Sequence, residues 1–386
     1  MGLSSDKPDP ARPRHGADRR DDRGKTPRGA LARRFAAGLI AAALSAAPAA
    51  AESLRIATWS PELTRKGPGL LLRDIEGGKD AQIAAVVQVI AEAAPDVLLL
   101  TGFDWDYDGR ALAALRARLA EAGQDYPHSF APQPNTGVPT GRDMDGNGRL
   151  GEPRDAQGYG RFTGADGMAL LSRVPIFAEE SRDFSGFLWR DLPEGLIAGA
   201  ELAPEAAAVQ RLSTTAHWDV ALRLPGNRRL HLLAWSATPP VYDGPEDRNG
   251  RRNRDEAAFW LRYLDGRLPE APPPPPYVLL GDANLDPADG EGRRDALDDL
   301  LRDPRLQDPR PASPGARAAA DPGQRGDPAL DTADYDPPTG NLRVEYILPS
   351  ADLRVDGAGV IWPEDPAAAA ITASRHRLIW VDITLP

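Results

Sequence analysis

The chain has 386 residues, and 46 Lys plus Arg stand against 57 Asp plus Glu, which gives a formal net charge of −11. A surface this negative repels phosphate backbones, so non-specific binding to nucleic acid is disfavoured. The sequence has no cysteine, which excludes disulfides, thiolate zinc sites and a cysteine nucleophile, and its 39 Pro and 37 Gly show no collagen-like or coiled-coil period.

Residues 1–51 have the pattern of a disordered basic leader followed by an export signal. Arg33 and Arg34 precede a short apolar run, and small residues continue to Ala51, as in a cleavable signal. An uncleaved membrane anchor is the alternative, although the run is short for a bilayer span. We therefore expect an exported protein, periplasmic or extracellular, with residues 52–386 as one domain and no membrane span after the signal is removed.

The remainder of the chain alternates strands and helices. The spacing of Ile83, Val86, Val87 and Ile90 predicts one apolar face of a helix. Further helices are expected at 109–122, 253–266 and 292–302, and long surface loops at 131–165 and 303–341. Strands are expected at 54–59, 96–101, 168–172, 217–224, 230–236, 277–281, 343–348 and 378–385. Helices alternating with strand pairs favour an α/β sandwich over a purely parallel sheet.

Two groups of acidic residues are candidate cation sites. Asp104 and Asp106 alternate after the second strand and together predict a cation site, with a solvated loop as the alternative. Asp143, Asp145 and Asn147 occupy positions 1, 3 and 5 of an EF-hand-like loop, with glycine at position 6. A carboxylate later in the loop would have to replace the glutamate that usually occupies position 12. Two interpretations are therefore open: a Ca²⁺ loop over 143–155, and an ordinary Asp/Asn/Gly turn.

Several segments, in order, resemble the endonuclease/exonuclease/phosphatase superfamily, and especially an exported bacterial branch of it. They are 54–59, 95–104, 167–176, 217–220, 230–250, 277–286, 343–350 and 374–382. The resemblance implies a deoxyribonuclease-I-like four-layered α/β sandwich over residues 52–386, with two packed mixed sheets flanked by helices. It also implies metal-dependent phosphoester hydrolysis with Mg²⁺ as the cofactor.

The resemblance assigns roles to a few matching residues. Asp282 would orient the attacking water, Asn284 would contact phosphate or metal, and His376 would be the second member of the family's final Asp–His pair. The other family positions carry different residues. Ser60 replaces the Asn that follows the first strand, and Gly102 replaces the Glu that follows the second strand. Ser236 replaces the His of a middle strand, Arg375 replaces the Asp of the final Asp–His pair, and Glu345 replaces the Asp of an Arg-Val-Asp-Tyr motif. Arg375 and Ser236 are then expected to contact substrate rather than to take part in turnover.

These substitutions leave three functional hypotheses. Because loss of a positioned acid or base costs about 10²–10⁴ in rate, the first is a phosphoester hydrolase with a degenerate active site. The second is a non-catalytic extracytoplasmic module that binds a phosphorylated or anionic small molecule through Arg375. The third is an active hydrolase with a rearranged metal site built from Asp104, Asp106 and Asp282.

Overall fold

The computed structural model describes residues 53–385. The predicted leader and export signal lie outside the described residues. Within residues 53–385, no helix has both the length and the hydropathy that crossing a bilayer requires.

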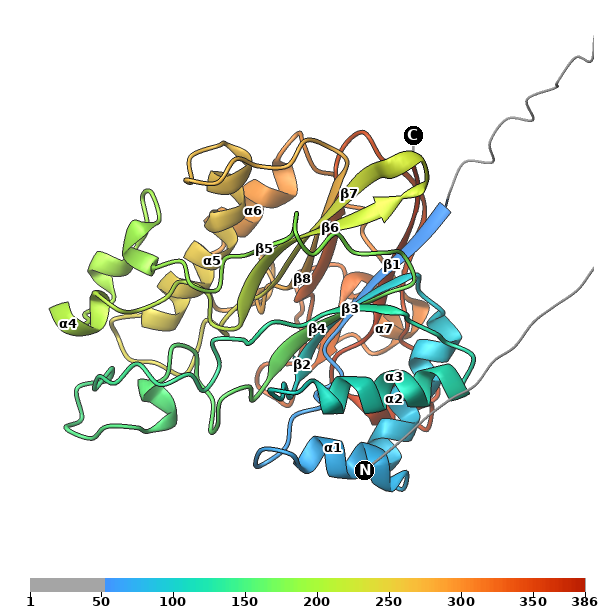
Figure 1. The fold of residues 1–386 in the computed structure, drawn as a ribbon, viewed down its shortest axis with the longest axis horizontal. Coiled ribbons are helices and arrows are strands. Elements are labelled where there is room, and N and C mark those ends of the chain that lie inside the picture. The colour runs from blue at the N-terminus through green and yellow to red at the C-terminus, as the bar shows by residue number, and fades with distance from the viewer. Residues whose placement is uncertain (1–52, 386) are drawn as a thin grey trace, which may run out of the picture. The chain divides into compact units, whose positions relative to one another are not determined.

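Two mixed sheets form the centre of the fold (Figure 1). The first has the strand order β12-β13-β1-β2-β4-β3 and the second has the order β11-β8-β7-β6-β5, while β9 and β10 pair separately. The strands are β1 (Ser53–Trp59), β2 (Val97–Phe103), β3 (His128–Phe130), β4 (Gly167–Ser172), β5 (Arg182–Asp183), β6 (Ala216–Leu224), β7 (Arg228–Ser236), β8 (Tyr277–Asp282), β9 (Ala333–Asp334), β10 (Asn341–Leu342), β11 (Glu345–Pro349), β12 (Arg354–Val360) and β13 (Ile379–Thr384).

Helices cover the outer faces of both sheets (Figure 1). The α-helices are α1 (Leu70–Gly77), α2 (Ala81–Ala93), α3 (Arg110–Glu121), α4 (Pro204–Ala207), α5 (Arg248–Leu264), α6 (Asp295–Arg302), α7 (Pro314–Ala318) and α8 (Ala369–Ala373). Short 3₁₀ turns lie at Pro153–Asp155, Trp189–Asp191, Ile197–Gly199, Pro225–Asn227 and Pro328–Leu330.

Alternation along the strands divides the buried residues into separate cores. In β2, Val97 and Leu99 face the other sheet, whereas Leu98 and Leu100 pack against α1, α2 and α3. A third core joins α5 and α6 to β7, β8 and β11. Three cores between four layers confirm the predicted α/β sandwich of two mixed sheets with flanking helices.

The sequence pattern located the principal strands but not every segment. The stretch 303–341, expected to be a long surface loop, instead contains α7 and the β9–β10 pair, and it buries Ala316 and Ala333. Helix α5 begins at Arg248, earlier than predicted, because its first turns carry polar side chains that are typical of a loop.

The register places several strand ends side by side. Strands β1 and β2 run parallel, as do β7 and β8, so Ser236 lies opposite Asp282. Strand β11 runs antiparallel to β8 and puts Glu345 opposite Asp282 as well. Polar residues from distant parts of the chain therefore meet at one edge of the two sheets.

Candidate active site

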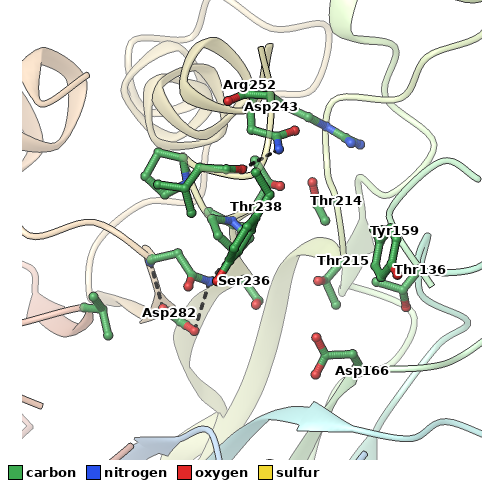
Figure 2. A pocket seen from close by; sticks show the side chains of 18 of the residues that line it. Thr136, Tyr159, Asp166, Thr214, Thr215, Ser236, Thr238, Asp243, Arg252 and Asp282 are labelled. Atoms are coloured by element: carbon green, nitrogen blue, oxygen red, sulfur yellow. Dashed lines mark hydrogen bonds between the residues drawn. The ribbon is translucent and has the colours of Figure 1, made fainter. Parts of the chain in front are cut away.

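A cavity of about 1240 Å³ opens over these strand ends. In Figure 2, Ser236 and Asp282 lie on one side of the pocket, and Thr136, Thr215 and Asp166 lie on the other. Each side chain labelled there carries a polar group. A small molecule entering it would meet hydroxyl and carboxylate groups at its floor.

One wall holds a buried histidine–carboxylate pair. His376 Nδ1 hydrogen-bonds to Glu345 Oε1, and His376 Nε2 lies 3.3 Å from the Tyr335 hydroxyl oxygen. Burial alone would lower the pKa of His376, but the charge and hydrogen bond of Glu345, with the charge of Asp282, raise it to about 9. His376 is therefore an imidazolium at neutral pH, suited to donate a hydrogen bond or a proton to a phosphoryl oxygen.

Asp282 and Asn284 form a compact unit beside that pair. The Asn284 backbone N–H donates to Asp282 Oδ1 at 2.7 Å, and Asn284 Nδ2 donates to Oδ2 at 3.1 Å. Burial, reinforced by the charge of Glu345, raises the pKa of Asp282 to about 7. A carboxylate with a pKa near neutrality can both accept and release a proton, as an acid–base residue must.

An ion pair between Arg375 and Glu62 lies next to His376 in the same pocket. Arg375 Nε donates to Glu62 Oε1 at 2.9 Å, and the Arg375 backbone N–H donates to Oε2 at 2.8 Å. Burial opposes ionisation of Glu62, yet these hydrogen bonds hold its pKa below the usual value. The charge of Arg375 is thus neutralised by a neighbour within the pocket wall.

The structure gives Asp104 and Asp106 structural contacts. Asp104 accepts hydrogen bonds from Thr64 Oγ1 and from two backbone N–H groups. Asp106 caps α3 by accepting from the N–H groups of Arg110 and Ala111. Neither belongs to the groups of converging metal-ligand atoms found within residues 53–385.

Polar side chains of α5 hold the pocket wall from behind. Glu256 accepts hydrogen bonds from the backbone N–H groups of Thr214 at 2.5 Å and Thr238 at 2.7 Å. Asn253 Nδ2 donates to the carbonyls of Thr238 at 2.8 Å and Ala283 at 2.7 Å. Three segments that line or adjoin the pocket are thereby tied to one helix.

Three carboxylates of the loop 143–155 lie close together at one rim of the pocket. Carboxylate oxygens of Asp143, Asp145 and Asp155 lie within 4.8 Å of one another. Asp143 Oδ2 accepts from the Gly148 N–H at 2.7 Å, and Asp145 and Asn147 also hydrogen-bond to each other. Calcium binding by Asp143, Asp145 and Asn147 stays a prediction.

Calcium titration of the unmodified chain should release or absorb saturable heat that the Asp145→Ala variant does not show. The reason is that the substitution removes one of three carboxylates that would share the charge of the ion. Isothermal calorimetry measures this, with exposed Asp125→Ala as the matched control. Identical flat titrations of the parent and the Asp145→Ala variant would end the calcium interpretation.

Comparison with known proteins agrees with the arrangement of the strands. The sequence profile of the Endonuclease/Exonuclease/phosphatase family matches residues 75–376. The chain belongs to the endonuclease/exonuclease/phosphatase family. This family includes phosphoesterases and nucleases and generally depends on divalent metal ions.

A solved structure of the family shares the fold at low sequence identity. The endonuclease/exonuclease/phosphatase from Beutenbergia cavernae DSM 12333 is 19% identical with a TM-score of 0.53, covering 86% of this chain and 72% of that one. A family protein from Bacteroides thetaiotaomicron is 13% identical with a TM-score of 0.49, covering 87% of this chain and 99% of that one. A family protein from Leptotrichia buccalis C-1013-b is 16% identical with a TM-score of 0.46, covering 86% of this chain and 100% of that one. None of the curated proteins matches the sequence.

The positions that resemble the family's metal seat do not fit a divalent cation. Gly102 has φ +62° and carries no ligand, and a Cβ built there would lie 2.8 Å from Ser60 Oγ. Ser60, which stands where the resemblance implies an Asn, offers a neutral hydroxyl, and the Glu62 carboxylate is engaged by Arg375. Asp282, Asn284 and His376 thus keep the residue types that the resemblance implies, whereas positions 60 and 102 do not.

Three residues of the pocket were not selected from the sequence as site residues. Glu345, named from the sequence only as a changed family position, lies opposite Asp282 because β11 pairs with β8, and it hydrogen-bonds to His376. Glu62 is brought to Arg375 by the loop after β1. Asp166 lies directly before β4 and lines the pocket. From the sequence it could be recognised only as an acidic residue that precedes a buried strand.

Proposed function

We propose that this pocket binds a phosphorylated small molecule and that the chain is a phosphoester hydrolase with a degenerate active site. The observation that carries the proposal is the contrast between two groups of residues in the pocket. Asp282–Asn284 and Glu345–His376 are assembled, whereas Ser60, Gly102, Ser236 and the Glu62–Arg375 pair occupy the positions of the family's other groups.

The retained residues suggest a division of work. His376, positively charged and held by Glu345, would donate a hydrogen bond to a phosphoryl oxygen. Asp282, with its pKa near neutrality, would orient a water and accept its proton as the oxygen attacks phosphorus. The family's divalent ion would supply charge stabilisation, and at the substituted positions this contribution is lost.

The alternative of a metal-free anion-binding module would use the same charged groups as the hydrolase, so the charges of the pocket do not separate the two. Arg375 is neutralised by Glu62 and His376 by Glu345, while Asp166 and Asp282 add negative charge to the floor. Export remains part of the proposal and is supported by the basic leader and the apolar run 35–47.

Hydrolysis of bis-p-nitrophenyl phosphate by the full chain in Mg²⁺ should be at least about 10²-fold slower than by an intact family member assayed alongside. Asp282→Asn should remove the residual rate, and exposed Asp108→Asn should preserve it. Assays in Mn²⁺, Ca²⁺ and EDTA complete the measurement.

Two results would contradict the proposal. Turnover at an ordinary rate by the unmodified chain would show that the site is not degenerate. Stabilisation by the phosphoester in EDTA, without turnover in any metal, would instead support the binding module.

A further inference from the structure

We infer that the Tyr335 hydroxyl and the His376 Nε2–H form a pair of hydrogen-bond donors that together hold one phosphoryl oxygen of the ligand. The inference rests on the proposed function for the identity of the ligand, but its test measures binding as well as turnover. Tyr335 lies between the segments that carry the family resemblance, so this second donor would be a feature of this chain.

A short additional strand brings Tyr335 to the pocket. The Asp334 N–H, in β9, donates to the Arg375 carbonyl at 2.9 Å, and the Arg377 N–H donates to the Thr332 carbonyl at 2.7 Å. The Thr332 hydroxyl also accepts from two backbone N–H groups around the start of β11, at 2.9 and 3.1 Å. Because Tyr335 directly follows β9, these hydrogen bonds fix the backbone that carries it.

The ring of Tyr335 is held on two sides. Its centroid lies 5.5 Å from that of the His376 ring, and the two planes meet at 87°, an edge-to-face contact. The guanidinium carbon of Arg375 lies 5.6 Å from the centroid of the tyrosine ring. Tyr335, Arg375 and His376 all line the cavity. The tyrosine hydroxyl is therefore placed beside the imidazole in the pocket.

The hydrogen-bond roles leave the phenolic proton of Tyr335 available to a ligand. With its pKa at about 9, His376 carries a proton on each ring nitrogen at neutral pH, and Nδ1 is paired with Glu345. The Nε2–H therefore donates to the Tyr335 oxygen, which lies 3.3 Å away. Tyr335 cannot donate back to that nitrogen, and its hydroxyl has no other hydrogen-bond partner within residues 53–385.

The separation of the two donors suits a single oxygen atom. An oxygen about 2.8 Å from each of two atoms that are 3.3 Å apart makes two hydrogen bonds of ordinary length. The contact between Tyr335 and His376 is itself long for a hydrogen bond. Little is therefore lost when both donors turn to a phosphoryl oxygen instead.

The charges around Tyr335 keep its hydroxyl protonated. Burial, reinforced by the negative charges of Asp282 and Glu345, raises the pKa of Tyr335 well above its usual value, and Arg375 acts in the opposite direction. The hydroxyl is thus a neutral donor at physiological pH, and its proton stays on the tyrosine. As water attacks phosphorus, negative charge grows on the phosphoryl oxygens, and donors aimed at them replace part of the stabilisation that a metal ion would give.

Binding of inorganic phosphate tests the inference without turnover. Tyr335→Phe removes the hydroxyl and keeps the ring contacts. It should weaken phosphate binding, measured by calorimetry in EDTA and again in Mg²⁺, by at least about fivefold. The matched control Tyr107→Phe should bind phosphate as the parent does, since Tyr107 is 88% exposed and does not line the cavity.

Turnover and thermal unfolding separate this role from a structural one. In Mg²⁺, Tyr335→Phe should lower the residual kcat with bis-p-nitrophenyl phosphate by at least about tenfold. Its melting temperature without phosphate should equal that of the parent, because only one long hydrogen bond is lost.

Three results would each overturn the inference: unchanged phosphate affinity in Tyr335→Phe, no phosphate binding by the parent in either condition, or a loss of affinity accompanied by a lower melting temperature. Weaker phosphate binding by Tyr335→Phe, in a chain whose parent shows no turnover, would support the donor pair and contradict the proposed hydrolase.

Discussion

The double variant Arg375→Asp with Ser236→His should hydrolyse a phosphodiester in Mg²⁺ about 10²-fold faster than the unmodified chain. Removing the guanidinium takes a positive charge from the pocket and partly frees the oxygens of Glu62, beside which the new carboxylate would lie, so two carboxylates become available to a divalent ion. A histidine at 236 would face Asp282 across neighbouring strands and restore a second imidazole to the site. The measurement is the initial rate over a range of Mg²⁺ concentrations.

Two controls separate the causes of such a gain. Arg375→Ala with Ser236→His removes the positive charge without adding a ligand, so it should recover only part of the rate. Adding Gly102→Glu should give no further gain, because the left-handed backbone and the contact with Ser60 Oγ oppose any side chain there. If the double variant is as slow as the parent, the residues at positions 236 and 375 are not the reason for the low activity.

The Gly281→Ala variant should lose about 3 kcal/mol or more of unfolding free energy. Gly281 has φ +146°, and a Cβ built there would lie 1.9 Å from the Trp235 carbonyl oxygen. That oxygen belongs to the backbone of the neighbouring strand β7, so relief requires the sheet itself to move. Urea denaturation monitored by tryptophan fluorescence measures the loss.

Gly77→Ala is the matched control for this stability change. Gly77 is the last residue of α1, and no atom lies within 4 Å of a Cβ built there. This variant should be as stable as the parent or slightly more stable, since alanine loses less backbone entropy on folding. Equal stability of Gly281→Ala and the parent would show that β7 and β8 can separate at this point without cost.

Local patterns were sufficient for the parts of the fold whose burial is regular. Strands such as β2 and β8 are continuous apolar runs, and the apolar face of α2 repeats at helical spacing, so each was predicted close to its observed bounds. The first turns of α5, before residue 253, were missed because residues such as Asn249 and Arg252 are polar, although Arg252 is buried, as is Glu256 further along. Their burial depends on partners in distant loops, which a local pattern does not reveal.

The same reasoning explains what was predicted of the site. Asp282 and Asn284 lie in one short motif, and His376 follows a recognisable order of segments, so the sequence indicates them. The partners Glu345 and Glu62 depend on strand register and on the path of a loop. Asp166 could be placed in the pocket only after β4 was known to run antiparallel to β2.

The hydrogen bonds from α5 to the pocket wall have an implication for how this protein can change. Glu256 and Asn253 fix the spacing between the wall segments without lining the cavity themselves. Substitutions on this helix could therefore widen or narrow the entrance while every group that meets the ligand is conserved. Ligand preference and reaction chemistry are, in this architecture, separately adjustable.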